Sequence, residues 1–298
     1  MGATATGKTA LSLDIAERFD VEIVSVDSAL IFRDMDIGTA KPTADILQAV
    51  PHHLIDILDP AESWSVWEFV EQSRRLVDEI CARGKVPLLA GGTMMYFHAF
   101  ETGLNRLPAA DPEIRQRLED EVAELGLAAL HRRLAEVDPA SAQKIRESDP
   151  QRIQRALEVF ELSGKPLSWW QQQESRGFDG VLQKIVLEAD DRSVLHQRIA
   201  QRFHQMLEQG LIEEVSGLYH RGDLHPGLPS MRCVGYRQVW QHLAGEDSRE
   251  QMIDKAIAAT RQLAKRQITW LRKQQDATAY NCLKYRKDAI FRQLEGLF

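Results

Sequence analysis

The sequence predicts an α/β fold in which helices flank a parallel sheet and a small all-helical domain is inserted into the chain. Short apolar runs alternate with segments of helical periodicity through about the first third of the chain. Strands separated by helices are typical of βαβ units, whose strands run parallel. Residues 111–175 then carry helical signals only. This change of pattern divides the chain into a core and an insertion.

Two strand–helix pairs define the predicted sheet. Thr9–Phe19 has apolar residues on one helical face, and the β-branched run Val21–Val26 after it reads as a strand that ends at Asp27. Ser65–Arg83 is a predicted helix, and Val86–Ala90 is a predicted buried strand. Both strands are expected to lie in one sheet.

The insertion is predicted from three helix starts. Aspartate precedes proline at residues 111–112, 138–139 and 149–150. Aspartate is favoured at the N-cap and proline at the first helical position, so each pair begins a helix. Val181–Leu187 reads as a strand that returns to the sheet, and the rest is mostly helical with a break at 222–229. The predicted domains are a core of residues 1–103 plus 179–298 and an inserted helical domain of residues 104–178.

Composition excludes several classes of protein. The 298 residues are 44% hydrophobic and 27% charged, which is ordinary for a soluble globular chain. No apolar stretch approaches the roughly 18 residues of a membrane helix, and no secretory signal opens the sequence, so we expect a cytoplasmic protein without a membrane partner. The three scattered cysteines form no CxxC pair. A net charge of −7 argues against general nucleic-acid binding but allows a local basic patch.

Residues 2–9, here called the glycine-rich loop, match the phosphate-binding pattern G-x-x-x-x-G-K-[ST] at every fixed position. Backbone N–H groups would surround phosphate oxygens, Lys8 would neutralise charge, and Thr9 would offer a hydroxyl to Mg²⁺. The pattern makes the expected fold P-loop NTPase-like, with an ATP-binding-like motif. It names a ligand class and not a reaction. Such a loop follows a central strand, and Met1 stands where that strand would end, so we expect the sheet to lack this strand.

Two further residues follow predicted strands and would face the phosphates. Asp27 is either a magnesium-holding or hydroxyl-orienting aspartate, as in a metabolite kinase, or a general base at the carboxyl edge of the sheet. Thr93 is either a helix cap or a part of the site. No acidic residue follows the strand that ends before Thr93, and no N/T-K-x-D signature is present. Both absences weaken the interpretation as a nucleotide hydrolase.

Basic residues gather in the C-terminal part of the chain. Lys255–Lys273 holds six basic residues and no acid. Arg232–Arg237 adds two arginines and a tyrosine around a glycine. Arg152 and Arg155 share a helical face, and Arg202 would face the phosphates or pair with an acid. In an acidic chain, these unopposed charges favour a polyanionic partner over a merely solvated surface.

Four sequence blocks together carry a family resemblance. They are the glycine-rich loop, the segment from Val26 to Pro42 (VDSALI and MDIGTAKP), Arg232–Arg237 (RCVGYR) and Lys265–Arg272 (KRQITWLR). With these blocks the chain resembles the bacterial tRNA dimethylallyltransferases, also called tRNA isopentenyltransferases. The match covers nearly the whole chain and is weakest after Gln274. Two positions differ from the usual family pattern: Ala3 stands where proline is frequent, and Phe32 stands where tyrosine is frequent.

The resemblance implies transfer of a dimethylallyl group from dimethylallyl diphosphate to N6 of the adenosine at tRNA position 37, with release of diphosphate. It implies Mg²⁺, the tRNA anticodon stem-loop as partner, a monomer, a catalytic core and an inserted domain that binds the tRNA. Asp27 would be the general base, assisted by Lys8 and Thr93, with Thr9 at the metal. The implied prenyl diphosphate ligands are Gly2, Ala3, Thr4, Ala5, Thr6, Gly7, Lys8, Thr9 and Arg202. The implied tRNA contacts are Asp27, Ser28, Ala29, Leu30, Thr93, Arg115, Gln151, Arg152, Ile153, Gln154, Arg155, Arg232, Cys233, Val234, Gly235, Tyr236, Arg237, Lys265, Arg266, Gln267, Ile268, Thr269, Trp270, Leu271 and Arg272.

Two other functions share part of this pattern. A metabolite or nucleoside kinase would use the same loop and a strand-end aspartate, but it would leave the basic segment and the insertion unexplained. An RNA-binding protein with a nucleotide switch would bind tRNA without releasing diphosphate from a prenyl donor. Prenyl transfer is the function that accounts for all four blocks.

Overall fold

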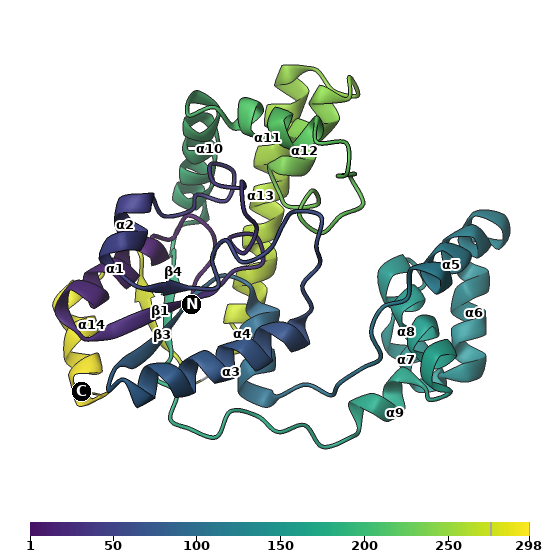
Figure 1. Cartoon of the computed structure of the whole chain (residues 1–298), viewed down its shortest axis with the longest axis horizontal. Helices are drawn as coiled ribbons and strands as arrows, with labels where there is room; N and C mark the ends of the chain where they lie inside the picture. The colour runs from purple at the N-terminus through teal and green to yellow at the C-terminus, as the bar shows by residue number, and fades with distance from the viewer. Residues whose placement is uncertain (275, 298) are drawn as a thin grey trace. The chain divides into compact units, whose positions relative to one another are not determined.

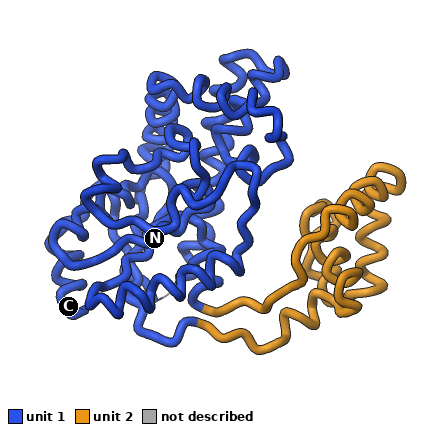
Figure 2. Tube along the Cα trace, viewed as in Figure 1, with its two compact units in different colours: residues 1–101, 178–298 blue, residues 102–177 orange. Residues whose placement is uncertain are grey.

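The computed structural model describes residues 1–274 and 276–297 and divides into two compact units (Figures 1 and 2). Unit 1 contains Met1–Glu101 and Phe178–Phe298, and unit 2 contains Thr102–Gly177. Each unit has a hydrophobic core of its own. Among the described residues, no helix combines the length and the apolar character that a membrane span requires.

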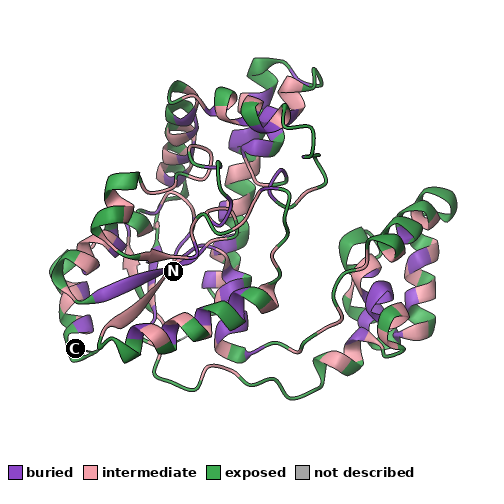
Figure 3. Ribbon diagram, in the orientation of Figure 1, coloured by how far each residue is buried: buried purple, intermediate pink, exposed green. Residues whose placement is uncertain are grey.

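The first sheet of unit 1 is parallel and has the strand order β2-β1-β3. Strand β1 is Val21–Val26, β2 is His52–His53 and β3 is Val86–Gly91. The predictions for β1 and β3 are confirmed. All residues of β1 are buried, including the polar Glu22 and Ser25, and the other four are the β-branched residues valine and isoleucine (Figure 3). Val26 pairs with Gly91, so the two strands end side by side.

A second parallel sheet pairs β4, Ile185–Glu188, with β5, Thr278–Asn281. The predicted sheet of β1 and β3 is confirmed, but the prediction that the later strand returns to it is wrong: among the described residues, β4 lies in a second sheet. Strand β4 begins later than the predicted Val181–Leu187, because Val181 is 89% exposed and has no strand partner. Gly2 forms an isolated parallel bridge with Leu187, and the Leu187 N–H donates to the Met1 carbonyl at 2.9 Å. The start of the glycine-rich loop thus lies against β4.

Helices cover both faces of β1 and β3. Alternate residues of a strand point to opposite faces: Val24 and Val26 pack with α3 (Val66–Ala82) and α4 (Met94–Thr102), and Val21 packs with α1 (Lys8–Arg18). A capping box starts α3, in which Ser65 and Glu68 each bond the other's backbone N–H. Helix α2 is Ala44–Ala49.

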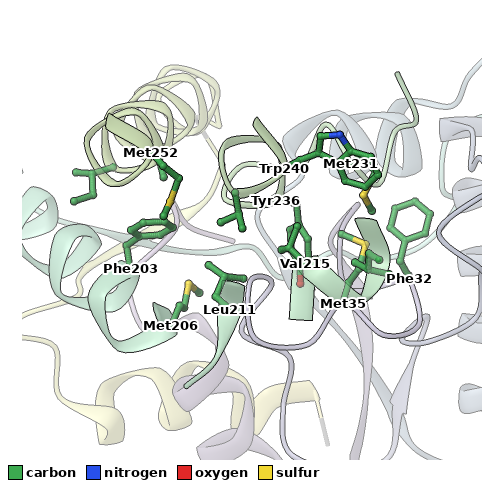
Figure 4. Close-up of a cluster of buried hydrophobic side chains, with 14 of the residues drawn as sticks. Phe32, Met35, Phe203, Met206, Leu211, Val215, Met231, Tyr236, Trp240 and Met252 are labelled. Atoms are coloured by element: carbon green, nitrogen blue, oxygen red, sulfur yellow. The ribbon is translucent and has the colours of Figure 1, made fainter. Parts of the chain in front are cut away.

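The largest core of unit 1 lies among the C-terminal helices (Figure 4). Phe203, Val215, Tyr236 and Met252 come from four different helices and pack together with Met35. The prediction of a mostly helical segment is confirmed, apart from β5. The helices are α10 (Arg192–Glu208), α11 (Leu211–Tyr219), α12 (Tyr236–Leu243), α13 (Arg249–Leu271), α14 (Lys287–Leu294) and the 3₁₀ turn η1 (Glu295–Leu297).

Unit 2 is entirely helical. Asp111, Asp138 and Asp149 each accept backbone N–H bonds at a helix start that has proline in its first turn, so the three predicted caps are confirmed. The sequence pattern did not predict the separate helix that begins after Gly126. The helices are α5 (Pro112–Leu125), α6 (Leu127–Val137), α7 (Pro139–Lys144), α8 (Pro150–Ser163) and α9 (Leu167–Gln171).

Candidate active site

A cavity of about 650 Å³ lies in unit 1, where the glycine-rich loop meets the ends of β1 and β3 and the helices α10, α12 and α13. It brings together residues of all four sequence blocks. The predicted site residues that line it are Thr4, Ala5, Lys8, Thr9, Asp27, Ser28, Ala29, Leu30, Thr93, Arg202, Arg232, Cys233, Val234, Gly235, Tyr236, Arg266, Gln267 and Trp270. Of the predicted residues in unit 1, Gly2, Ala3, Thr6, Gly7, Arg237, Lys265, Ile268, Thr269, Leu271 and Arg272 lie outside its lining.

The glycine-rich loop is held in a curved conformation by its own polar groups. The Thr6 hydroxyl donates to the Ala3 carbonyl at 2.8 Å, and the Lys8 ammonium donates to the same oxygen at 2.7 Å. Gly7 has a φ of 85°, a left-handed conformation that glycine adopts without strain, and α1 begins at the next residue. The loop therefore ends at the N-terminus of a helix, where backbone N–H groups attract anions.

Two cations line the cavity at this loop, Lys8 from the loop itself and Arg202 from α10. Burial lowers the pKa of Lys8 to about 8; the nearby Asp27 opposes this shift, and Arg202 adds to it. Burial also lowers the pKa of Arg202, whose guanidinium donates to the Thr39 carbonyl at 3.4 Å. Withdrawing two positive charges from water is unfavourable without a counter-charge. The cavity is therefore electrostatically suited to a multiply charged anion.

Asp27 and Thr93 follow two neighbouring strands. The Asp27 Oδ1 accepts the Ala29 N–H at 2.9 Å, and the Thr93 hydroxyl oxygen accepts the Ser28 N–H at 3.1 Å. The strands approach closely because Gly91 has no side chain: a Cβ there would lie 2.0 Å from the Val26 carbonyl oxygen. These contacts place a carboxylate and a hydroxyl at the same edge of the sheet, facing the cavity.

Glu214 on α11 is a residue of the site that the sequence analysis did not identify. Its carboxylate accepts the backbone N–H groups of Asp36, Ile37 and Gly38, at 3.0, 2.7 and 3.2 Å, and also the hydroxyl of Tyr236. A Cβ at Gly38 would lie 2.4 Å from the Tyr236 ring. This carboxylate fixes the loop of residues 36–40, whose last residues line the cavity.

Lys41 was also missed. Its side chain is 4% exposed, forms ion pairs with Asp36 and Asp56, and donates to the Phe32 carbonyl at 2.9 Å. The block MDIGTAKP is thus held by one half-buried acid from α11 and by its own lysine, whose side chain is buried. The role of Glu214 has no local sequence signal, because the residues 36–38 that it bonds lie more than 170 positions away in the sequence.

Several predicted tRNA contacts have buried side chains, so these side chains are engaged inside the protein. Ile153 packs in the core of unit 2 and Leu271 in a core of unit 1, so neither side chain is available to RNA. Tyr236 is fully buried, with its hydroxyl bonded to Glu214. Gln267 is 8% exposed and uses its carboxamide inside the protein. On α13, Lys265, Arg266 and Arg272 are exposed, as is Arg237 on α12.

The remaining predicted contacts lie in unit 2. Arg115 and Arg155 both pair with the fully buried Glu158, and the Gln154 amide donates to the Arg115 carbonyl at 3.1 Å. Gln151 and Arg152 are exposed at the start of α8. The side chain of Arg115 is 47% exposed although its guanidinium is bonded. The carboxylate between the two arginines therefore fixes their positions at the surface of unit 2.

Comparisons with known proteins identify the family. The family model described as IPP transferase matches residues 30–274. The chain belongs to the IPP transferase family. It is 54% identical to a tRNA dimethylallyltransferase of Burkholderia cenocepacia (strain HI2424) over 301 residues, which cover 100% of this chain and 92% of that protein. A tRNA dimethylallyltransferase of Cupriavidus taiwanensis is also 54% identical, over 95% of this chain and 90% of its own length. The resemblance inferred from four sequence blocks is confirmed.

Solved structures of the family share the fold. The tRNA isopentenylpyrophosphate transferase of Bacillus halodurans is 38% identical, with a TM-score of 0.70 over 99% of this chain and 93% of that one. The corresponding transferase of Staphylococcus epidermidis is 33% identical, with a TM-score of 0.69 over 100% of this chain and 98% of its own. A eukaryotic dimethylallyltransferase acting on tRNA, 24% identical with a TM-score of 0.79, shows the same fold. The α/β arrangement with parallel sheets flanked by helices is thus the fold of this family.

Proposed function

We propose that this member of the IPP transferase family transfers a dimethylallyl group from dimethylallyl diphosphate to N6 of adenosine 37 of tRNA and releases diphosphate. The observation that carries the proposal is the cavity itself, in which an anion-binding loop with two half-buried cations faces a strand-end carboxylate. Basic and aromatic side chains of α13 line the same cavity. A diphosphate, an acceptor amine and an RNA backbone each have complementary groups there.

The glycine-rich loop binds the diphosphate and stabilises it as it leaves. The bond that breaks joins carbon to oxygen, so negative charge develops on the departing diphosphate. The Lys8 ammonium, the Arg202 guanidinium and loop N–H groups would stabilise this charge, because charges and dipoles that are held in place before the reaction stabilise a transition state. No phosphoryl group moves, and no water has to be activated.

Thr9 is the residue that would hold Mg²⁺. It lines the cavity and offers an oxygen donor, which Mg²⁺ prefers. Mg²⁺ is commonly bound by one or two side chains together with substrate phosphates. When bound, the ion would supply positive charge to the diphosphate oxygens.

Asp27 takes the proton that the acceptor amine loses. The lone pair of an adenine N6 amine is delocalised into the ring, so the amine is a weak nucleophile. As the new carbon–nitrogen bond forms, the carboxylate accepts one N6 proton, which balances the charge on nitrogen. The Ala29 N–H and the Thr93–Ser28 hydrogen bond hold the carboxylate and the turn beside it. The adenine must leave its stack to reach this depth.

The RNA is bound by exposed basic residues of both units. In unit 1, Arg232, Arg266 and Trp270 line the cavity and offer two charges and an aromatic face. In unit 2, the Arg115 side chain held by Glu158 and the exposed Arg152 are suited to contact phosphates of the anticodon stem-loop. We assign the role of RNA-binding domain to unit 2 on this basis.

Nucleoside mass spectrometry tests the reaction. The protein is incubated with unmodified tRNA, dimethylallyl diphosphate and Mg²⁺, and the digested RNA is searched for N6-prenylated adenosine. We expect the product with the wild type, and a loss of about 100-fold or more with Asp27→Ala, the scale of a missing general base. Asp27→Ala should still bind tRNA, and the control Asp45→Ala, an exposed acid on α2, should behave as wild type.

Two outcomes would contradict the proposal. Near-normal activity of Asp27→Ala would remove Asp27 from the role of base. Absence of product from folded wild-type protein that instead consumes ATP would replace prenyl transfer by phosphoryl transfer.

A further inference from the structure

The carboxamide of Gln267 joins three parts of the active-site cavity. Its Oε1 accepts the N–H of Thr4 at 2.8 Å, and its Nε2 donates to the carbonyl of Gly92 at 2.9 Å. Gln267 lies on α13, Thr4 in the glycine-rich loop and Gly92 between β3 and Thr93. Gln267 is 8% exposed, so the hydrogen bond to Gly92 is buried and the one to Thr4 is partly shielded from water.

The two hydrogen bonds connect parts of the protein with different tasks in the proposed reaction. Thr4 begins the segment that surrounds the diphosphate, and Gly92 precedes Thr93, which bonds the turn carrying Asp27. On α13, the neighbouring Arg266 is exposed and lines the cavity on the side assigned to RNA. A movement of α13 would therefore break a hydrogen bond to the diphosphate loop, to the Thr93 turn, or to both.

We propose that Gln267 is a positioning residue that couples RNA binding on α13 to diphosphate binding in the glycine-rich loop. RNA phosphates on Lys265 and Arg266 hold α13 in place, and the carboxamide then holds the loop in the conformation that accepts diphosphate. By linkage, diphosphate must strengthen RNA binding by the same factor. The inference rests on the proposed function, because it takes diphosphate and RNA as the two ligands.

Gly92 provides an independent way to disturb this contact. A Cβ at residue 92 would lie 2.6 Å from Gln267 Nε2, and the next nearest atom, the Gly2 carbonyl oxygen, is at 3.4 Å. The backbone of Gly92 is not in the left-handed region, so alanine meets no conformational obstacle there. Gly92→Ala therefore acts mainly by displacing the carboxamide.

Isothermal titration calorimetry with inorganic diphosphate and Mg²⁺, in the absence and presence of an anticodon stem-loop RNA, tests the proposal. For the wild type, RNA should strengthen diphosphate binding by about fivefold or more, the usual scale of coupling between sites. Gln267→Ala should weaken diphosphate binding about tenfold, the effect of leaving buried partners unpaired, and should remove the RNA effect. The control Gln262→Ala, an exposed glutamine on the same helix, should match the wild type.

A double-mutant cycle separates coupling from loss of stability. Gly92→Ala alone should reproduce both effects, but it should add less than about twofold in the Gln267→Ala background, where the colliding carboxamide is gone. Thermal unfolding of each variant shows which variants are folded. If Gln267→Ala does not fold, the diphosphate affinity of Gly92→Ala with and without RNA tests the coupling in its place. An RNA effect that is absent from the wild type, or that persists in the folded variants, would overturn the coupling. A wild type that does not bind diphosphate at all would instead overturn the proposed function.

Discussion

The ionisation of a single residue, Lys8, should make diphosphate binding depend on pH. Burial lowers its pKa to about 8, so part of the unliganded protein lacks this charge in mildly alkaline solution. A bound diphosphate favours the ammonium form and raises the pKa. Binding above about pH 8 must then take up a proton at Lys8, and affinity for inorganic diphosphate should fall as the pH rises.

Calorimetry in buffers of different ionisation enthalpy measures this proton uptake at about pH 8.5. The matched variant is Lys8→Arg, which keeps the charge but does not titrate in this range. Subtracting its proton uptake from that of the wild type removes the protons taken up by diphosphate itself. Equal uptake by the two proteins would show that Lys8 is already fully charged before the ligand binds.

The residues that the sequence predicted are those whose local pattern carries the chemistry. Lys8 lies within a motif of fixed spacing, and Asp27 ends a β-branched run, so both could be identified without a structure. Glu214 and the internal role of Gln267 could not. Glu214 bonds residues more than 170 positions away, and Gln267 bonds Thr4 across 263 positions. Such contacts exist only after the helices have packed.

Helix α8 contributes the buried carboxylate of Glu158 to unit 2, and the stability of unit 2 should depend on it. The side chain of Glu158 is fully buried. Burial alone would raise the pKa of Glu158, but the hydrogen bonds from Arg115 and Arg155 have the larger combined effect and lower this pKa. The stabilisation is present above the ordinary carboxyl pKa and is lost as the pH falls. Glu158→Gln leaves two guanidiniums without their counter-charge and should destabilise unit 2 by about 3 kcal/mol.

Hydrogen exchange of the full chain, followed by mass spectrometry, measures this effect. Amides of α5 and α8 should exchange about 100-fold faster in Glu158→Gln, since 1.4 kcal/mol corresponds to roughly a factor of ten. The exposed Glu136 on α6 provides the control Glu136→Gln, which should exchange as the wild type does. Unchanged exchange in Glu158→Gln would mean that the pair adds nothing to the stability of unit 2.

Elements with strong start and stop signals were predicted, and those that depend on distant partners were not. The three Asp-Pro pairs cap their helices because the cap is a local interaction. Strand β5 was missed because Thr278–Asn281 has no apolar run, and its first two residues are exposed. It forms a strand because β4 offers it a parallel edge, with Ile185 opposite Thr278. Pairing of this kind leaves little trace in the sequence itself.

At the scale of the whole molecule, the site of unit 1 is assembled from both ends of the chain. The glycine-rich loop contacts β4 at Leu187 and α13 at Gln267, while unit 2 is built from one continuous segment. The basic residues of α13 are therefore brought beside the anion-binding loop by folding. A protein with a net charge of −7 thereby presents a locally positive surface around the cavity.

RNA binding should depend on this local surface and not on the net charge. Each phosphate neutralised by a basic residue releases counterions, so the logarithm of the affinity falls linearly with the logarithm of the salt concentration. Lys265 is exposed on α13 beside Arg266. Lys265→Ala should weaken binding of an anticodon stem-loop RNA and reduce the steepness of the salt dependence by about 1.

Arg75→Ala removes the same charge from the exposed pair with Glu79 on α3 and should leave the slope unchanged. Fluorescence anisotropy with labelled RNA over a range of KCl concentrations gives both slopes. Equal slopes for wild type and Lys265→Ala would exclude this lysine from the RNA interface, whereas equal loss in both variants would show that net charge governs binding.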